Sequence, residues 1–138
     1  MLVYLTRKEG FNAAHKLWVK SWTEEQNFEL FGKCANKNFH GHNYEYEVTV
    51  KGKPDPLTGL IMNVKDLGKI MKVKVSDVLD HTNLNLDPNF LPEDAQPTIE
   101  NLVYYIWKEI EPELPESCEL HCVKLRETAK SYAEYYGE

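Results

Sequence analysis

The feature that most constrains the fold is a strict alternation of residue types over residues 40–53. One set of alternate positions carries His40, His42, Tyr44, Tyr46, Val48 and Val50. The positions between them carry Gly41, Asn43, Glu45, Glu47, Thr49 and Lys51. Because successive side chains of a strand leave opposite faces, this pattern predicts a long antiparallel strand with one buried face. It also places two histidines at the end of the apolar face.

The rest of the chain predicts an α+β domain in which an antiparallel sheet carries two helices on one face. Four further strands are expected. The first is N-terminal and runs toward His15, the second begins over residues 60–63, and the last two span 118–128 and 132–136. The expected helical segments are a capped turn at 23–26, a helix over 64–79, and a helix that Thr98 caps and Pro112 ends. Residues 80–97 are expected to form a loop.

The length of 138 residues suits a single domain over residues 1–138. The net charge of −6 argues against a general nucleic-acid surface, although it leaves room for a local basic pocket. No apolar run approaches the ~18 residues of a membrane span, and the first residues lack a signal-peptide pattern. A cytoplasmic location and no membrane partner are therefore expected.

The cysteines do not form a paired framework. Cys118 and Cys122 are expected on one face of one strand, about 13 Å apart, which is too far for a disulfide. Cys34 stands alone in the sequence. Free thiols fit a reducing compartment, which agrees with the expected cytoplasmic location.

Three histidines indicate a metal site. His40 and His42 leave one face of the same strand, since Gly41 between them points the other way. His15, on a neighbouring strand, would complete a set of three nitrogens. Three neutral ligands leave zinc's fourth position open, as a catalytic zinc requires. Two alternatives remain open: packed or solvent-facing histidines without metal, and a structural zinc with Cys34 as the fourth ligand.

Four further side chains are candidates for acid–base or binding roles. Asp80 precedes His81, and a carboxylate beside an imidazole supports its charged form; the alternative is an ordinary loop turn. Cys34 offers a thiol that can act as a base if its pKa is lowered. The alternative is that Cys34 is a small buried side chain without a chemical role. Glu127 shares a strand face with apolar residues. It either accepts two N–H bonds from an amidine-like edge, such as that of a pterin, or lies in solvent.

Taken together, these residues carry a resemblance. The matching segments are 11–15 (FNAAH), 30–34 (LFGKC), 40–44 (HGHNY), 79–81 (LDH), 97–101 (PTIEN) and 125–128 (LRET). The ordered set spans nearly the whole chain. It closely resembles the family that includes 6-pyruvoyl-tetrahydropterin synthase and 6-carboxy-tetrahydropterin synthase.

The resemblance implies a fold and an assembly. The fold would be the tunnelling fold, an antiparallel four-stranded sheet with two helices on one face. Sheets from three subunits would close into a barrel, and two trimers would stack into a homohexamer. The substrate would be the small molecule 7,8-dihydroneopterin triphosphate. The redox change would be internal, so no nicotinamide or flavin is expected.

The resemblance also implies the residues of the site. Zinc would be bound by His15, His40 and His42. The catalytic triad, assembled across a subunit interface, would be Cys34, Asp80 and His81. The pterin ring would be anchored by Glu127, with Thr98 and Glu100 near it.

The product depends on the branch of the family. Five residues separate Cys34 from His40, as in the 6-pyruvoyl enzymes, whereas many 6-carboxy enzymes have three. The spacing therefore favours 6-pyruvoyl-tetrahydropterin over the alternative, 6-carboxy-tetrahydropterin with release of acetaldehyde, which belongs to the queuosine pathway. Cys34 argues against a third branch that has glutamate there, and Phe39 stands where family members often have glycine. The rival of another class is a non-enzymatic, oligomeric zinc-binding module.

Overall fold

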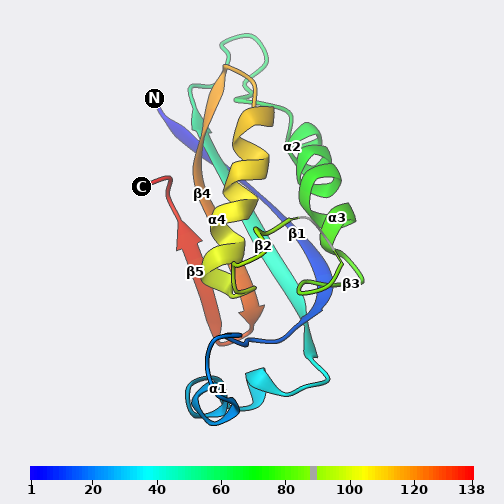
Figure 1. The fold of residues 1–138 in the computed structure, drawn as a ribbon. Helices are drawn as coiled ribbons and strands as arrows, with labels where there is room; N and C mark the ends of the chain where they lie inside the picture. Colours follow the sequence, from blue (N-terminus) through cyan, green and yellow to red (C-terminus); the bar gives the residue numbers. More distant parts are fainter. Residues whose placement is uncertain (88–89) are drawn as a thin grey trace.

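A computed structural model describes residues 1–87 and 90–138 of the protein. A five-stranded sheet runs through it in the order β3-β1-β2-β4-β5, as Figure 1 shows. Its strands are β1 (Val3–His15), β2 (His40–Gly52), β3 (Thr82–Asn83), β4 (Cys118–Thr128) and β5 (Ser131–Tyr135). The four long strands pair antiparallel, and the two-residue β3 adds a short parallel pairing to the edge of β1. The predicted α+β class and antiparallel sheet are confirmed.

The register of β1 and β2 places the histidines at one end of the sheet. The two strands pair from Val3 opposite Gly52 to His15 opposite His40, without interruption. His15 is the last residue of β1 and His40 is the first of β2. Residues directly opposite each other share a face of the sheet, so the His15 and His40 side chains leave on the same side.

Helices cover one face of the sheet, which Figure 1 shows. They are α2 (Val64–Met71), a π-helical turn (Lys72–Ser76), α3 (Asp77–Leu79) and α4 (Ile99–Ile110), which a 3₁₀ turn (Glu111–Glu113) follows. The predicted helices over 64–79 and after Thr98 are therefore confirmed. No helix in the described part of the chain is long and apolar enough to cross a bilayer.

The π-helical turn has a partner in the sheet. Such a turn frees a backbone carbonyl from the regular helical ladder. The Tyr46 hydroxyl donates to the Met71 carbonyl at 2.9 Å, and it lies 2.6 Å from the Ser76 hydroxyl. Burial raises the pKa of Tyr46, so its hydroxyl stays protonated. The buried polar groups of the turn are thus satisfied from β2.

The core lies between the helices and the covered face of the sheet. The inward face of β2 supplies Tyr44, Tyr46, Val48 and Val50, each at most 1% exposed. Helix α4 contributes Leu102, Val103, Ile106, Trp107 and Ile110. The apolar alternate residues of β2 therefore face the core and the polar ones face the open side of the sheet, as predicted.

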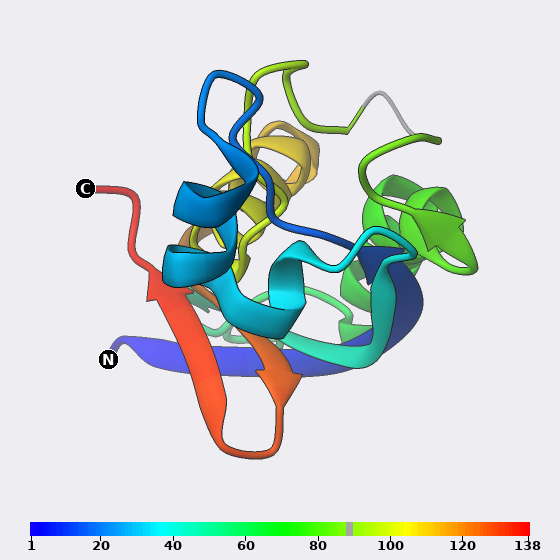
Figure 2. The same cartoon turned by 60° about the horizontal axis from the view of Figure 1, so that its bottom comes forward.

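Helix α1 (Glu24–Phe31) and the 3₁₀ turn Gly32–Ala35 lie beyond the end of the sheet, which comes forward in Figure 2. The predicted cap is present, because Thr23 and Gln26 exchange side-chain to backbone hydrogen bonds. Buried Asn27 holds the preceding loop by bonding both the N–H and the carbonyl of Val19. This cap and this amide keep the helix against the end of the sheet.

The strand expected to begin over 60–63 is absent. The Leu60 carbonyl accepts from the Asp55 N–H, which closes a turn. Asn63 caps α2 by accepting from the Lys65 N–H. The buried side chains of Ile61 and Met62 fill the end of the core instead. A short apolar run can be buried without pairing as a strand, so the apolar residues at this position did not indicate a strand. The expected loop over 80–97 contains β3 and includes residues 88–89, which lie outside the described residues.

The expectation that Cys118 and Cys122 share a face is wrong. Val50 pairs with Leu120, but the next pair is Thr49 with Cys122, so His121 is an extra residue in β4. A bulge of one residue reverses which side chains face the core. Cys118 faces the core, and Cys122 is buried on the opposite side. Both cysteines and Cys34 are free thiols, as predicted.

Replacing Ile106 by alanine should destabilise the fold. The side chain is fully buried on α4, and deleting such a side chain costs about 2–5 kcal/mol through lost transfer energy and the cavity left behind. Urea unfolding at fixed protein concentration measures the change. Lys108→Ala, on the exposed side of the same helix, is the control and should change the free energy of unfolding by less than about 0.5 kcal/mol. Equal effects of the two changes would contradict this packing.

Candidate metal centre

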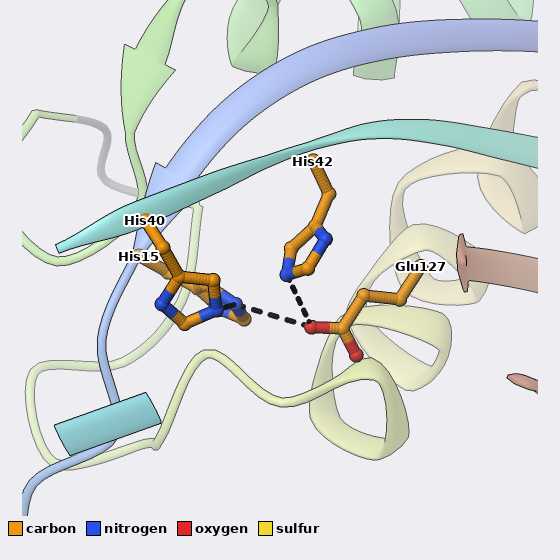
Figure 3. Close-up of side chains that lie close together, drawn as sticks. All are labelled: His15, His40, His42 and Glu127. Atoms are coloured by element: carbon orange, nitrogen blue, oxygen red, sulfur yellow. Dashed lines mark hydrogen bonds and ion pairs between the residues drawn. The ribbon is translucent and has the colours of Figure 1, made fainter. Parts of the chain in front are cut away.

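The three predicted ligand histidines meet at the end of the sheet where β1 ends and β2 begins. His15 Nε2 lies 3.1 Å from His40 Nε2. The ring centre of His42 lies 4.9 Å from that of His40 and 5.2 Å from that of His15. Figure 3 shows the three rings converging. The three side chains predicted as ligands therefore lie together at one point of the fold.

The His15 ring is oriented by the backbone of a distant segment. Its Nδ1 lies 2.7 Å from the Pro97 carbonyl, which can only accept, so Nδ1 carries the proton and donates. In the neutral ring, Nε2 then presents a lone pair toward His40 and His42. A carbonyl behind a ligand histidine is a common means of orienting metal ligands. Sequence reasoning missed Pro97, because a backbone carbonyl leaves no side-chain signal.

Glu127 joins the histidines. Its Oε1 lies 2.8 Å from His42 Nε2 and 3.2 Å from His15 Nε2 (Figure 3). One ligand atom from each of the four residues lies within 4.8 Å of the others. The Glu127 side chain is only 20% exposed, so the alternative of a solvated strand-end glutamate is wrong. Among the described residues, Cys34 is not part of this group, so the proposed fourth cysteine ligand gains no support.

The charges of the group suit a bound cation. Burial, followed by repulsion from the other histidines, lowers the pKa of His40. Burial also lowers the pKa of His42, although Glu127 opposes this. The contact with His15 lowers the pKa of Glu127, while burial acts against it. Neutral imidazoles beside an ionised carboxylate are the ligand set that divalent transition metals prefer.

The ligand atoms of the four-residue group are spaced closely enough to hold one zinc ion. His42 Nε2 is buried and has no hydrogen-bond partner in the described part of the chain, although the Glu127 carboxylate is near. His15 Nε2 faces the same carboxylate oxygen at 3.2 Å. Bonds of about 2.0–2.1 Å give a tetrahedral zinc site ligand separations of about 3.3 Å. Three of the six separations between these ligand atoms, at 2.8, 3.1 and 3.2 Å, are close to that value, and all six lie within 4.8 Å.

Cys34 lies in the 3₁₀ turn after α1 and is half-buried. Its carbonyl accepts from the Leu17 N–H at 2.8 Å, which ties the turn to the chain just after His15. Burial, then the charges of Glu127 and Cys34, raise the pKa of Tyr44. The Tyr44 hydroxyl is 3.4 Å from His15 Nδ1. The backbone of Cys34 therefore lies beside the segment that directly follows His15.

Asp80 and His81 form a dyad that is fixed to β1. Asp80 Oδ2 lies 2.8 Å from His81 Nδ1, and its Oδ1 accepts from the Asn12 N–H at 2.8 Å. These bonds, that of Asn12 first, lower the pKa of Asp80. His81 donates its backbone N–H to Asn12 and has a φ of 61°. Its side chain is 83% exposed. Among the described residues no hydrogen bond or ion pair joins the dyad to Cys34.

Thr98 and Glu100 lie at the start of α4. Thr98 is the N-cap, and its hydroxyl accepts from the Asn101 N–H. Glu100 is exposed in the first turn. Because Thr98 directly follows Pro97, which bonds to His15, this helix end is tied to the histidine group.

The backbone conformation at Phe39, directly before His40, is one that suits glycine. Its φ is 67°, a left-handed conformation that glycine adopts without strain and a bulky side chain rarely adopts. The Lys16 ammonium lies 5.1 Å from the centre of the Phe39 ring and 5.6 Å from that of Trp18. The ring therefore makes a cation–π contact that glycine could not supply.

The family follows from comparison with known proteins. A sequence model described as 6-pyruvoyl tetrahydropterin synthase matches residues 4–138. The chain belongs to this family. It is 43% identical over 134 residues to 6-pyruvoyl tetrahydrobiopterin synthase of Pongo abelii, covering 97% of this chain and 91% of the relative. It is 41% identical over 138 residues to that of Dictyostelium discoideum, covering 99% and 97%.

The fold comparison agrees. The structure of 6-pyruvoyl tetrahydropterin synthase from Caenorhabditis elegans superposes with a TM-score of 0.92 at 33% identity, covering 100% of this chain and 97% of the other. The resemblance in the sequence is thus confirmed. The chain is an enzyme, a lyase of the 6-pyruvoyl tetrahydropterin synthase type, and not a non-enzymatic zinc module. The names of these relatives do not favour the 6-carboxy alternative.

Proposed function

We propose that the enzyme converts 7,8-dihydroneopterin triphosphate to 6-pyruvoyl-tetrahydropterin, with loss of triphosphate, in a zinc-dependent reaction. The observation that carries this proposal is the group of three histidines and one glutamate in a chain of this family. The three free thiols fit a reducing compartment, and the cytoplasm is the proposed location.

The zinc would be held by His15, His40 and His42. Bound there, it supplies a Lewis acid that polarises the hydroxyls of the substrate side chain and acidifies the adjacent C–H. The chain prepares this site in two ways. The Pro97 carbonyl fixes the tautomer of His15, and the β1–β2 register sets His15 opposite His40.

The proton transfers are assigned to the triad. Cys34, as a thiolate, takes the proton from the side-chain carbon, and His81, supported by Asp80, returns a proton elsewhere on the substrate. Triphosphate leaves by elimination, so oxidation and reduction balance within one molecule. His81 is exposed and bonded only through Asp80 and Asn12 in the described structure. This supports a triad in which the dyad of one subunit serves Cys34 of another.

The pterin ring is assigned to the carboxylate of Glu127, with Thr98 and Glu100 nearby. A carboxylate binds the amidine-like edge of a pterin through two parallel hydrogen bonds. Glu127 ends the inward face of β4, and Thr98 follows the carbonyl that orients His15. The Glu127 carboxylate and the helix end at Thr98 therefore lie beside the proposed metal ligands, which supports this assignment.

We expect light scattering to show a hexamer. The edges of the sheet are β5 and the two-residue β3 beside β1, and exposed strand edges favour pairing with another chain. Mixed hexamers of Cys34→Ala and His81→Ala subunits should regain activity that neither variant has alone, because some interfaces combine an intact Cys34 with an intact His81. A stable, active monomer would contradict the shared site.

The product distinguishes the two branches of the family. We expect 6-pyruvoyl-tetrahydropterin, with the three-carbon side chain intact, because five residues separate Cys34 from His40. The pure enzyme would be incubated with 7,8-dihydroneopterin triphosphate, and the pterin product and acetaldehyde would be measured. Stoichiometric acetaldehyde would show that the 6-carboxy reaction occurs instead. It would leave the metal and triad assignments intact, since both reactions begin with the same groups.

A further inference from the structure

The segment that follows His15 is fixed by hydrogen bonds to its backbone. The Asn85 amide accepts from the Lys16 N–H at 2.9 Å and donates to the Lys16 carbonyl at 3.0 Å. The Gln96 amide makes the same two contacts with Trp18, at 3.1 and 2.7 Å. Because two side-chain amides hold this segment, the Lys16 side chain extends from a well-fixed backbone.

The Lys16 ammonium is held by aromatic rings and not by a carboxylate. It lies 5.1 Å from the centre of the Phe39 ring and 5.6 Å from that of the Trp18 ring. None of the ion pairs in the described part of the chain includes Lys16, although the chain has 22 acidic residues. Cation–π contacts place an ammonium without neutralising its charge. The charge of Lys16 therefore remains available to an anion.

The ring of Phe39 is kept at the cost of backbone strain. The φ of Phe39 is 67°, which a bulky side chain rarely adopts. Strained residues of this kind occur most often at ligand-binding and active sites. Glycine would relieve the strain but would also remove the ring that contacts Lys16. The strained residue is thus one of the two that place the ammonium.

The order of the strands gives the substrate a direction across the end of the sheet. The proposed pterin anchor, Glu127, lies on β4, His40 and His42 lie on the neighbouring β2, and His15 lies on β1 (Figure 1). The three-carbon side chain of 7,8-dihydroneopterin triphosphate separates its ring from its triphosphate. With the ring at β4 and the side-chain hydroxyls at the histidines, the triphosphate extends toward the end of β1. Lys16 directly follows β1 there.

We propose that Lys16 binds the triphosphate of the substrate and that Phe39 is a positioning residue, which holds the Lys16 ammonium in place. This inference rests on the proposed function, because it uses the proposed zinc site and pterin anchor to orient the substrate. Hydrogen bonds from an ammonium to phosphate oxygens are charge-assisted and therefore strong. Lys16 would thus strengthen the binding of molecules that carry the triphosphate and have no effect on those that lack it.

The test uses the full-length, zinc-loaded enzyme and two probes in calorimetry. Inorganic triphosphate, added as its magnesium complex so that it does not extract the zinc, reports on the anion site. 7,8-Dihydroneopterin, which lacks the phosphates, reports on the pterin site. Lys16→Gln should weaken triphosphate binding by about 10- to 100-fold, the range for loss of a charged hydrogen bond, and should leave dihydroneopterin binding unchanged. Lys16→Arg should retain most of the triphosphate affinity, because a guanidinium also binds phosphate.

Two further variants test the placement of the ammonium. Phe39→Gly should fold, since glycine adopts a φ of 67° without strain, and should weaken triphosphate binding by about 2- to 10-fold through loss of the cation–π contact. Its dihydroneopterin affinity and zinc content should not change. Lys108→Gln is the matched control, because the Lys108 ammonium also lies over a ring, that of Tyr104, but near the far end of α4. It should leave both affinities unchanged.

Three results would overturn the assignment of Lys16. They are failure of inorganic triphosphate to bind the unaltered enzyme, equal triphosphate affinities of the unaltered enzyme and Lys16→Gln, and equal losses of both affinities in Lys16→Gln, which would indicate a structural role. Where Lys16→Gln does not fold, unchanged triphosphate affinity in Phe39→Gly overturns it. Turnover separates these outcomes from failure of the proposed function. Product formation alongside any of them rejects only the role of Lys16, whereas lysine-dependent triphosphate binding without product rejects only the reaction.

Discussion

Replacement of His40 by alanine is expected to remove the metal and the activity together. His40 Nε2 lies 3.1 Å from His15 Nε2, and its ring belongs to the four-residue group at the end of the sheet. Zinc prefers four ligands in tetrahedral geometry, so the loss of one imidazole should lower affinity by more than the ~10–100-fold that follows loss of a supporting group. Metal analysis by mass spectrometry, with turnover on the same sample, measures both.

The control for this experiment is another histidine. His121 lies on β4, where its ring contacts Tyr4 and Tyr136 rather than the proposed ligands. His121→Ala should keep about one metal ion per chain and its turnover. The strongest contrary result would come from a triple variant of His15, His40 and His42. Full retention of metal in that protein would refute the assignment.

Replacement of Cys34 by alanine is expected to preserve the metal and lower turnover by about 10²–10⁴-fold, the usual contribution of a general base. The reason is that Cys34 lies outside the group of three histidines and Glu127, in a turn whose backbone bonds to Leu17, two residues beyond the end of β1. The variant therefore loses the proposed base and no proposed ligand. Metal content and steady-state turnover give the two readouts.

Cys122→Ala serves as the control, since Cys122 is also a free thiol but is buried on the face of the sheet opposite the core. It should retain metal and most of its turnover. If Cys34→Ala instead releases the metal, Cys34 is a ligand and the site is a structural one. If it retains both metal and full turnover, another group is the base.

Much of the fold could be predicted from the sequence, because strand alternation and helix caps depend on residues that are close together in the chain. The alternation from His40 to Val50 is a property of the strand itself, and it survives because that strand lies in the middle of the sheet with one covered face. The cap at Thr98 is predictable because the capping hydrogen bond spans only the four consecutive residues 98–101. The strand predicted to begin at Leu60 was wrong for the opposite reason, since the backbone there bonds to a distant residue: the Ser117 hydroxyl donates to the Ile61 carbonyl.

The candidate site was predictable only in part. The sequence predicts His40 and His42 as a pair of ligands because they are two residues apart on one strand. It predicts His15 as the third ligand because a second strand is expected to lie beside the first. The bulge at His121 reversed the faces of Cys118 and Cys122, and nothing in the local pattern of β4 marks it. A one-residue change of register arises from how two strands pair, which is a relation between distant segments.

What the sequence alone determined is the set of elements, the candidate residues and the family, because propensity, periodicity and ordered motifs operate over short stretches of chain. What only the tertiary structure decided is which of those residues meet. The Pro97 carbonyl reaches His15 across 82 residues, and Glu127 reaches the histidines from the far end of β4. Such contacts are set by the packing of α4 on the sheet and by strand register, and these are stabilised by the whole core rather than by any local segment.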